Sequence, residues 1–241
     1  SLNPSDFVRA LDILQTRLEK NIAGTITNEM GGLAVTNGMI QSAVLNIPMI
    51  DAACNGRAHP TGTMGSMGLT KKVDYVSRQV AVGGSREEDM YLENFVSGSL
   101  TAASKMIREA ADKAGGMVAV ARNPVPAEYV KNNGAVGARS RAGEIGEAFL
   151  SGTTGEEKIR NVADEIKGEI ETRGRVNSLD LQYKDGFDIG KVQIGEYELV
   201  FWNEYMTLEK DAKRYGTFPD LIATLEDSTG EPLPTAQIEA G

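Results

Sequence analysis

Two loops near the N-terminus carry the side chains that could do acid–base chemistry. Each loop is polar and contains glycine, and each follows a short apolar segment, residues 22–26 and residues 47–50. In open α/β sheets, ligands bind beyond the carboxyl ends of such strands, so we expect both loops to face one ligand. The candidate site residues in these loops are Glu29, Asp51, Cys54, Asn55, Gly56, Arg57 and His59.

Three of these residues bear charges. Glu29 or Asp51 could act as a general base, and Glu29 could also hold a ring N–H of a ligand. The alternative for Glu29 is a helix cap, because the helix dipole favours negative charge there. The alternative for Asp51 is an ion pair with Arg57. The guanidinium of Arg57 could instead clamp a carboxylate or a polarised carbonyl, in a direction set by the Asn55-Gly56 turn before it.

Cys54 and His59 are the only cysteine and the only histidine of the chain. They could form a nucleophile–base pair, or they could join Asp51 at a metal ion. Zinc sites usually need three or four protein ligands, and the sequence has no second cluster of Cys or His. We therefore predict no cofactor. The simpler interpretation is a packed thiol and a surface imidazole.

A second group of candidates lies in the C-terminal part of the chain. Trp202 could stack on a small heterocycle while Asn203 and Glu204 bind its polar edge. A core tryptophan with exposed neighbours fits the same pattern. Asp220 follows Pro219 and suits either a turn or a site.

The first half of the chain predicts the scaffold that positions the two loops. Apolar residues recur at spacings of three and four in three segments, which predicts helices over residues 4–18, 33–45 and 91–114. Strands are predicted over residues 22–26, 47–50, 73–82 and 117–121. The last of these is wholly apolar, as is typical of parallel sheets. The alternation of strands and helices indicates an α/β class, with a layered α/β sheet domain.

The second half has a different pattern. Helices are predicted over residues 136–150 and 156–172, and Gly152-Thr-Thr-Gly155 is interpreted as a helix start because no strand precedes it. After Gly174, apolar residues alternate with period two, which predicts a smaller antiparallel, barrel-like β-domain. We therefore predict two domains. Residues 1–133 form the α/β domain with the ligand loops, and residues 134–241 form a helical connector and the β-rich domain.

Composition excludes several classes of function. The formal net charge of −9 argues against nucleic-acid binding, because no local basic patch offsets it. No apolar run approaches the roughly 18 residues that a membrane helix needs. One cysteine allows no internal disulfide, so a cytoplasmic location is expected. The chain does not begin with Met, and we expect it to be a fragment.

Five motifs occur in register along the chain. They are Glu-Met-Gly-Gly-Leu-Ala from Glu29, Ile-Pro-Met-Ile-Asp-Ala-Ala-Cys-Asn-Gly-Arg-Ala-His-Pro from Ile47, Gly-Phe-Asp-Ile-Gly-Lys-Val from Gly186, Phe-Trp-Asn-Glu-Tyr from Phe201, and Phe-Pro-Asp-Leu-Ile from Phe218 with Thr-Gly-Glu-Pro after it. Together they resemble the S-methyl-thiohydantoin desulfurase family, also known as domain of unknown function 917 and as hydantoinase-like. The resemblance extends over roughly residues 29–241, without the family's N-terminal segment and C-terminal end.

The resemblance implies an α/β domain followed by a barrel-like domain, and genetic association with hydantoinase or oxoprolinase subunits. It also implies hydrolytic loss of a thiol from the C2 position of a thiohydantoin ring. The family's acidic and polar positions match Glu29, Asp51, Gly56-Arg57, Asn203-Glu204 and Asp220. The family usually has Asp where this chain has Ala53, and Gly where it has Cys54.

From the residues and the resemblance together we predict a hydrolase of the thiohydantoin or hydantoin class. Glu29 or Asp51 would activate water, Arg57 would stabilise developing charge, and Asn203 and Glu204 would orient the ring. The thiol of Cys54 could replace the carboxylate missing at Ala53 as nucleophile. The alternative is a non-catalytic binding or scaffold subunit that associates with a hydantoinase or oxoprolinase. Neither interpretation excludes a homo-oligomer.

Overall fold

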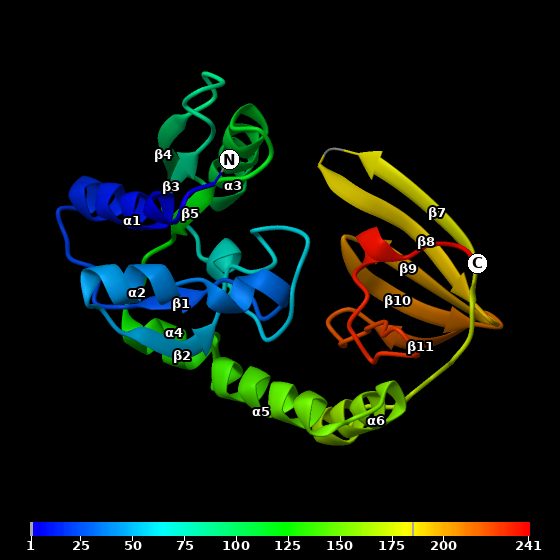
Figure 1. Cartoon of the computed structure of the whole chain (residues 1–241). Coiled ribbons are helices and arrows are strands. Elements are labelled where there is room, and N and C mark those ends of the chain that lie inside the picture. The colour runs from blue at the N-terminus through cyan, green and yellow to red at the C-terminus, as the bar shows by residue number, and fades with distance from the viewer. Residues whose placement is uncertain (1, 185) are drawn as a thin grey trace. The chain divides into compact units, whose positions relative to one another are not determined.

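The chain forms two compact units in the computed structural model, which describes residues 2–184 and 186–241 (Figure 1). Unit 1 consists of Ser1–Gly56 and Thr61–Ala138, and unit 2 of Arg57–Pro60 and Arg139–Gly241. The predicted loop from Asp51 to His59 is therefore divided, because the chain passes from unit 1 to unit 2 after Gly56. The fold is mixed α/β, with three separate sheets.

Unit 1 contains two three-stranded sheets, in the orders β1-β2-β6 and β4-β3-β5. Its strands are β1 (Thr25–Thr27), β2 (Met49–Ala53), β3 (Ser77–Gly83), β4 (Leu92–Gly98), β5 (Ala119–Arg122) and β6 (Ala135–Val136). Its helices are α1 (Pro4–Leu18), α2 (Met39–Leu45), α3 (Leu100–Lys113) and α4 (Ala127–Asn133), with 3-10 turns η1 (Gly32–Thr36) and η2 (Leu69–Lys71).

The β4-β3-β5 sheet is covered on both faces. Helix α1 packs on β3 and β5, where Leu14 meets Val80 and Val82. Helix α3 packs on the other face, where Ile107 and Ala110 meet the buried Ala81. This explains one wrong prediction: residues 117–121 are apolar because both sides of β5 are buried, and the strand pairs antiparallel to β3, not parallel.

The predicted helix over residues 91–114 is wrong in its first part. Leu92–Gly98 is strand β4, paired antiparallel with β3 along its whole length, and helix α3 begins only after the N-cap Ser99. Leu92 and Val96 pack toward α3, whereas Phe95 packs toward α1. A strand with apolar residues on both faces can mimic the three-and-four spacing of a helix.

The β1–β2 pair is parallel, as predicted from the alternation of strands and helices. Thr25 pairs with Met49 and Thr27 with Ala53, and the Cys54 N–H donates to the Thr27 carbonyl over 3.0 Å. The predicted helix between the strands is interrupted at Gly38, whose φ of 94° separates η1 from α2. The carboxyl ends of β1 and β2 therefore meet at one edge of this sheet.

Unit 2 contains one antiparallel sheet with the order β11-β10-β9-β8-β7. Helices α5 (Ala138–Ser151) and α6 (Gly155–Ile166) precede strands β7 (Val176–Lys184), β8 (Phe187–Ile194), β9 (Tyr197–Trp202), β10 (Glu204–Lys210) and β11 (Lys213–Thr217), and the short turn η3 (Thr235–Gln237) follows. The barrel-like closure expected from the sequence is not observed. Among the described strands, β7 and β11 each have one partner, so the sheet is open.

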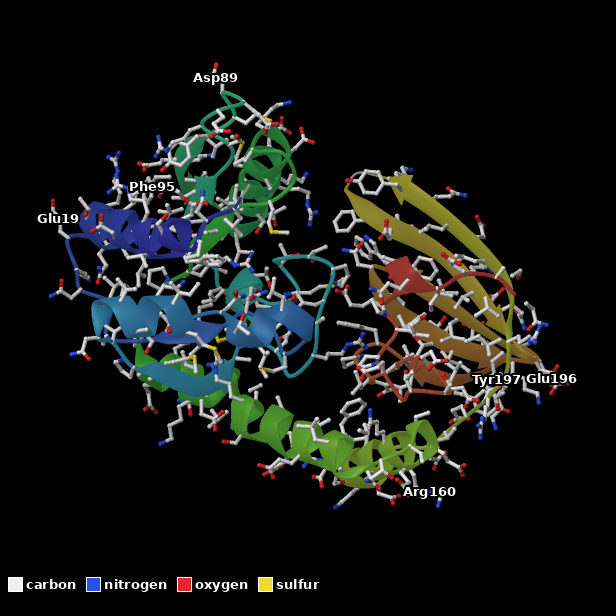
Figure 2. All side chains as sticks on the ribbon, viewed as in Figure 1. Glu19, Asp89, Phe95, Arg160, Glu196 and Tyr197 are labelled. Atoms are coloured by element: carbon white, nitrogen blue, oxygen red, sulfur yellow. The ribbon has the colours of Figure 1, made fainter. Side chains whose placement is uncertain are left out.

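The core of unit 2 lies on one face of this sheet, around Phe201, Val192 and Leu199. At one end of the sheet, Glu196 ion-pairs with Lys210 and the Tyr197 ring meets Tyr215 at 5.3 Å; Glu196 and Tyr197 are labelled in Figure 2. Glu196 and Lys210 therefore pair with each other at the surface of the sheet.

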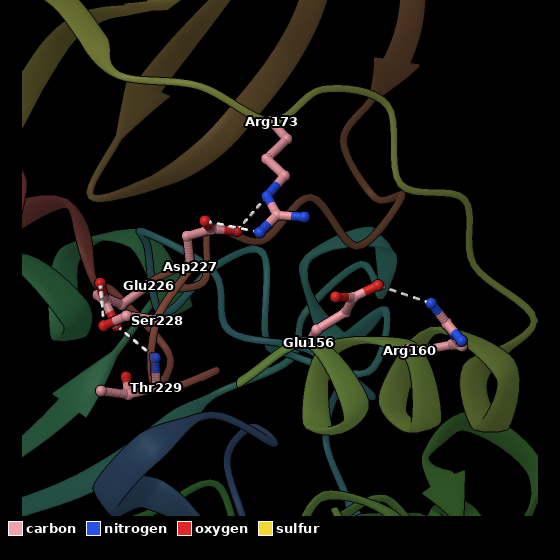
Figure 3. Close-up of polar contacts among 7 residues, drawn as sticks. All are labelled: Glu156, Arg160, Arg173, Glu226, Asp227, Ser228 and Thr229. Atoms are coloured by element: carbon pink, nitrogen blue, oxygen red, sulfur yellow. Dashed lines mark hydrogen bonds and ion pairs between the residues drawn. The ribbon is translucent and has the colours of Figure 1, made fainter. Parts of the chain in front are cut away.

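Helix α6 begins as predicted. The Thr154 hydroxyl accepts from Glu157 N–H, and Glu157 reaches back to Thr154 N–H, so the glycine run is a capping box and not a phosphate loop. A tight turn, residues 226–229, lies close to the helix start (Figure 3). The approach is so close that a Cβ on Gly155 would clash with the Ser228 carbonyl. In the described residues, no helix combines the length and apolar character needed to cross a membrane.

Candidate active site

The carboxyl end of β1 is fixed by a buried threonine. Thr27 is fully buried, and its hydroxyl donates to the backbone carbonyls of Glu29, at 3.1 Å, and Ala34, at 2.6 Å. These bonds hold the turn that leaves β1. Glu29 is thereby placed immediately beyond the strand, as the sequence predicted.

Glu29, Cys54 and Arg122 form one electrostatic cluster in unit 1. Arg122 is the last residue of β5, and both Cys54 and Glu29 act on its guanidinium. Burial lowers the pKa of Arg122, and the two neighbours oppose that effect. The arginine therefore keeps a cationic group in a partly buried setting, where its field is stronger than in water.

Burial raises the pKa of the Cys54 thiol above its ordinary value. Arg122 opposes this shift and Glu29 adds to it. The thiol is therefore held in its neutral form, which is the weaker nucleophile. The electrostatics therefore disfavour a nucleophilic role for Cys54.

A cavity of about 1080 Å³ within unit 1 borders this cluster. Cys54 and Arg122 line it, as do Asp51 and Asn28. Gly65 also lines it and belongs to the glycine-rich loop of residues 62–68. Apolar side chains of α1, β2 and β5 form much of the remaining wall. Mostly apolar pockets with a few polar groups at one place are the usual form of small-molecule sites.

The glycine-rich loop makes a close approach to Arg122. A Cβ on Gly62 would lie 3.0 Å from Nη1 of Arg122 and 3.2 Å from the Ser104 hydroxyl. That hydroxyl is buried without a hydrogen-bond partner in the described part of the chain. This loop, residues 62–68, thus forms a side of the cluster.

Asp51 and Asn55 occupy different surroundings from those expected. Strand β2 runs to Ala53, so Asp51 lies within the strand and not in the loop after it, although it still lines the cavity. Pairing with β6 extends the strand. Asn55 donates through Nδ2 to the Met64 carbonyl at 3.4 Å, which ties its loop to the glycine-rich loop. Gly56 is the last residue of unit 1 before the crossing.

Arg57 lies in unit 2, where its guanidinium serves the backbone. It donates to the carbonyls of Asp220 and Tyr205 and lies 4.9 Å from the Phe218 ring centroid. Burial lowers the pKa of Arg57, whereas Glu204 and Asp220 raise it. The structure thus brings together three predicted site residues, Arg57, Glu204 and Asp220.

The other predicted residues of unit 2 also contact backbone. The Asn203 side-chain oxygen accepts from Asp188 N–H at 2.9 Å, and Asp220 accepts from Thr217 N–H at 3.1 Å. His59 is only 6% exposed, so the surface-imidazole interpretation is wrong. Its segment enters unit 2 and is buried there.

Arg122 is the residue that sequence reasoning missed. A cationic side chain that ends a short apolar strand and precedes Asn123-Pro124 is the signal that could have revealed it. Among residues 2–184 and 186–241, no three His, Cys, Asp or Glu side chains gather as metal ligands.

Two family models cover almost the whole chain. The S-Me-THD-like N-terminal domain matches residues 2–93, and the S-Me-THD-like C-terminal domain matches residues 99–241. This chain belongs to the S-Me-THD-like family. The resemblance to S-methyl-thiohydantoin desulfurases seen in the sequence motifs is thereby confirmed.

The solved structures give a likeness in fold. An X-ray structure of a protein from Chromobacterium violaceum is 20% identical, with a TM-score of 0.71. The match covers 97% of this chain and 65% of that one, so the chain spans about two thirds of the length of its structural relative. No curated protein matches the chain.

Proposed function

We propose that this S-Me-THD-like chain is part of a hydrolase of the thiohydantoin or hydantoin class, with the reaction in the unit 1 cavity. The observation that carries this proposal is the cluster of Glu29, Cys54 and Arg122 beyond the ends of β1 and β2. A base and a cation beside a mostly apolar cavity suit hydrolysis of a polar ring. The family supports the choice of ring.

The reaction is a hydrolytic substitution at C2 of an S-alkyl thiohydantoin. Water loses a proton to a base, a C–O bond forms at C2, and negative charge develops on the ring. The C–S bond then breaks, and the departing sulfur takes up a proton to leave as a thiol. Water supplies the oxygen, so the step needs no oxidant or reductant.

Glu29 is our choice for the base that activates water, because it acts on Cys54 and Arg122, which line the cavity. Asp51, which lines the cavity itself, is the alternative. Arg122 would stabilise the developing negative charge, because its cation is already held beside Glu29. Because its pKa is raised, the Cys54 thiol would lie beside the reacting ring without attacking it.

The sequence assigned charge stabilisation to Arg57. Its guanidinium donates to three backbone carbonyls, those of Ala58, Asp220 and Tyr205, so we assign charge stabilisation to Arg122 instead. Ligand contacts by Asn203, Glu204 and Asp220 stay a prediction, to be tested with the same substrates.

The experiment is a turnover assay on a panel of S-methyl-thiohydantoins and hydantoins, following ring absorbance and thiol release. Enzyme-dependent thiol release that is lost in Glu29→Gln supports the proposal. No turnover across the panel, combined with a stoichiometric hydantoinase or oxoprolinase subunit in a native pull-down, would replace it with the scaffold interpretation.

A further inference from the structure

The charges around the unit 1 cavity run against the charge of the protein. The chain has a formal net charge of −9, with 34 acidic and 25 basic residues apart from histidine. The charged residues that line the cavity are Arg17, Lys20, Asp51, Arg78, Arg122 and Lys131. Five of these six are cationic, so the lining carries an excess of positive charge although the chain as a whole is acidic.

The acidic groups near the cavity do not balance this excess. Asp51 lines the wall and Glu29 acts on Arg122, but four further cations line the same space, from α1, the segment after it, β3 and α4. A cleft with low-dielectric walls and charges of one sign concentrates ligands of the opposite sign.

The end of the cavity with Arg78 and Arg122 is well defined by the fold. Arg78 lies near the start of β3 and Arg122 ends β5, and the two strands pair antiparallel with Gln79 opposite Arg122. Both arginines therefore lie at the same end of the sheet, Arg122 on the face of Gln79 and Arg78 on the other face, and both line the cavity. Apolar residues such as Leu14 and Val120 provide wall surface for the remainder of a ligand.

We infer that the unit 1 cavity selects an organic anion, a small heterocyclic or apolar body that carries a carboxylate or equivalent permanent negative charge. The inference rests on the proposed function only for the identity of the ring in the ligand. The preference for an anion rests on the charges that line the cavity. The ring would lie beside Glu29 and Arg122, and the permanent charge would be held by the surplus cations, Arg78 and Lys131 among them. The substrate class is then acidic ring compounds, not neutral ones.

The test compares two probes that differ only in charge, hydantoin-5-acetate and hydantoin-5-acetamide, by titration calorimetry with the full chain. We expect the acid to bind at least about tenfold more tightly at low salt, and the preference to shrink as salt screens the charges. Equal affinity for both probes, or binding of neither, would overturn the inference.

The double variant Arg78→Gln/Lys131→Gln identifies the source of the preference. Both side chains are exposed, so the variant is expected to fold. It should lose most of the preference for the acid and keep its affinity for the amide. Lys105→Gln, on the exposed side of α3 and outside the cavity lining, is the matched control and should bind as the unchanged protein does. A preference that survives in the double variant would contradict the inference.

Turnover separates this inference from the proposed function. Selective binding of the acid without hydrolysis of any ring would leave the anion site standing and reject the hydrolase. Hydrolysis of neutral thiohydantoins without any preference for acids would support the hydrolase and reject the anion site.

Discussion

The two units use their charged and polar side chains in different ways. In unit 1, Arg122 is influenced by Glu29 and Cys54 beside a cavity. In unit 2, the guanidinium of Arg57 and the amide of Asn203 bind backbone atoms. A charged loop residue is therefore a poor guide to chemistry until its hydrogen-bond partners are known.

The largest effects are expected when the charges of the unit 1 cluster are removed. We expect Glu29→Gln to lower kcat/KM for thiol release by about 10²- to 10⁴-fold, since a general base contributes that much. Arg122→Gln should cost about 10²- to 10³-fold, as loss of an oxyanion donor does. The measurement is steady-state turnover of an S-methyl-thiohydantoin.

Lys105→Gln is the control for the loss of a charge in unit 1 and should retain full activity. Arg57→Gln is the counterpart in unit 2. If Arg57→Gln abolished turnover of the folded protein while Arg122→Gln did not, the roles of the two arginines would have to be exchanged.

The second prediction concerns stability and unit 2. Arg57→Ala leaves the carbonyls of Tyr205 and Asp220 without their donor and removes the contact with Phe218. We expect the free energy of unfolding to fall by about 1–2 kcal/mol, because each hydrogen bond contributes about 0.5–1.5 kcal/mol and neither acceptor is fully buried. Fluorescence of Trp202, the only tryptophan, follows the unfolding of this unit in urea.

Arg57→Lys sharpens the result. One ammonium cannot reproduce a planar guanidinium that donates from three nitrogens, so this variant should recover only part of the lost stability. Full recovery would show that charge matters here and that geometry does not.

The sequence predicted the β1–β2 arrangement well because its signals are local. Two apolar segments, a helical segment between them and polar loops after each define a parallel pair, and the structure places Glu29 and Cys54 at its carboxyl end. The family was also recognisable, because its motifs are short and in register.

Other features depend on contacts that a linear sequence does not reveal. Strand β4 was read as helix because both of its faces are covered, which obscures the period of two. The open edges of the unit 2 sheet, at β7 and β11, follow from strand order. Arg122 was missed because β5 joins the cluster through folding, from a position 68 residues after Cys54.

The third prediction tests the electrostatics of the unit 1 cluster without any substrate. Cys54 is the only cysteine, so its alkylation by iodoacetamide reports one site. Its raised pKa predicts slower reaction at neutral pH than that of a free thiol, because only the thiolate reacts. The measurement is mass spectrometry of the alkylated fraction against time.

Variants of the neighbours should move this rate in opposite directions. Arg122→Gln removes the group that lowers the Cys54 pKa and should slow alkylation, and Glu29→Gln removes a group that raises it and should accelerate alkylation. We expect severalfold changes in the alkylation rate, because the rate follows the fraction of thiolate. Lys105→Gln is the control. Equal rates in all variants would show that the three groups do not interact.

The smallest expected effect concerns the tight turn near the start of α6, drawn in Figure 3. The Glu226 carboxylate accepts from the Ser228 hydroxyl at 2.8 Å and from the Thr229 N–H at 2.6 Å. Bonds from Thr229 and Ser228 lower the pKa of Glu226 from 4.5 to about 2. The carboxylate therefore stabilises the folded state fully above about pH 4.5, and this contribution is lost as the pH falls toward about 2.

Urea unfolding of the protein and of Glu226→Gln at several pH values checks this sign. The difference in stability between the two should be largest above pH 4.5 and should shrink as the pH falls toward about 2. Glu147→Gln, which removes an exposed carboxylate of α5, should show no such trend. A constant difference for Glu226→Gln across this range would mean that the turn is held by its shape and not by the charge, which would weaken the view that unit 2 uses its charges for structure.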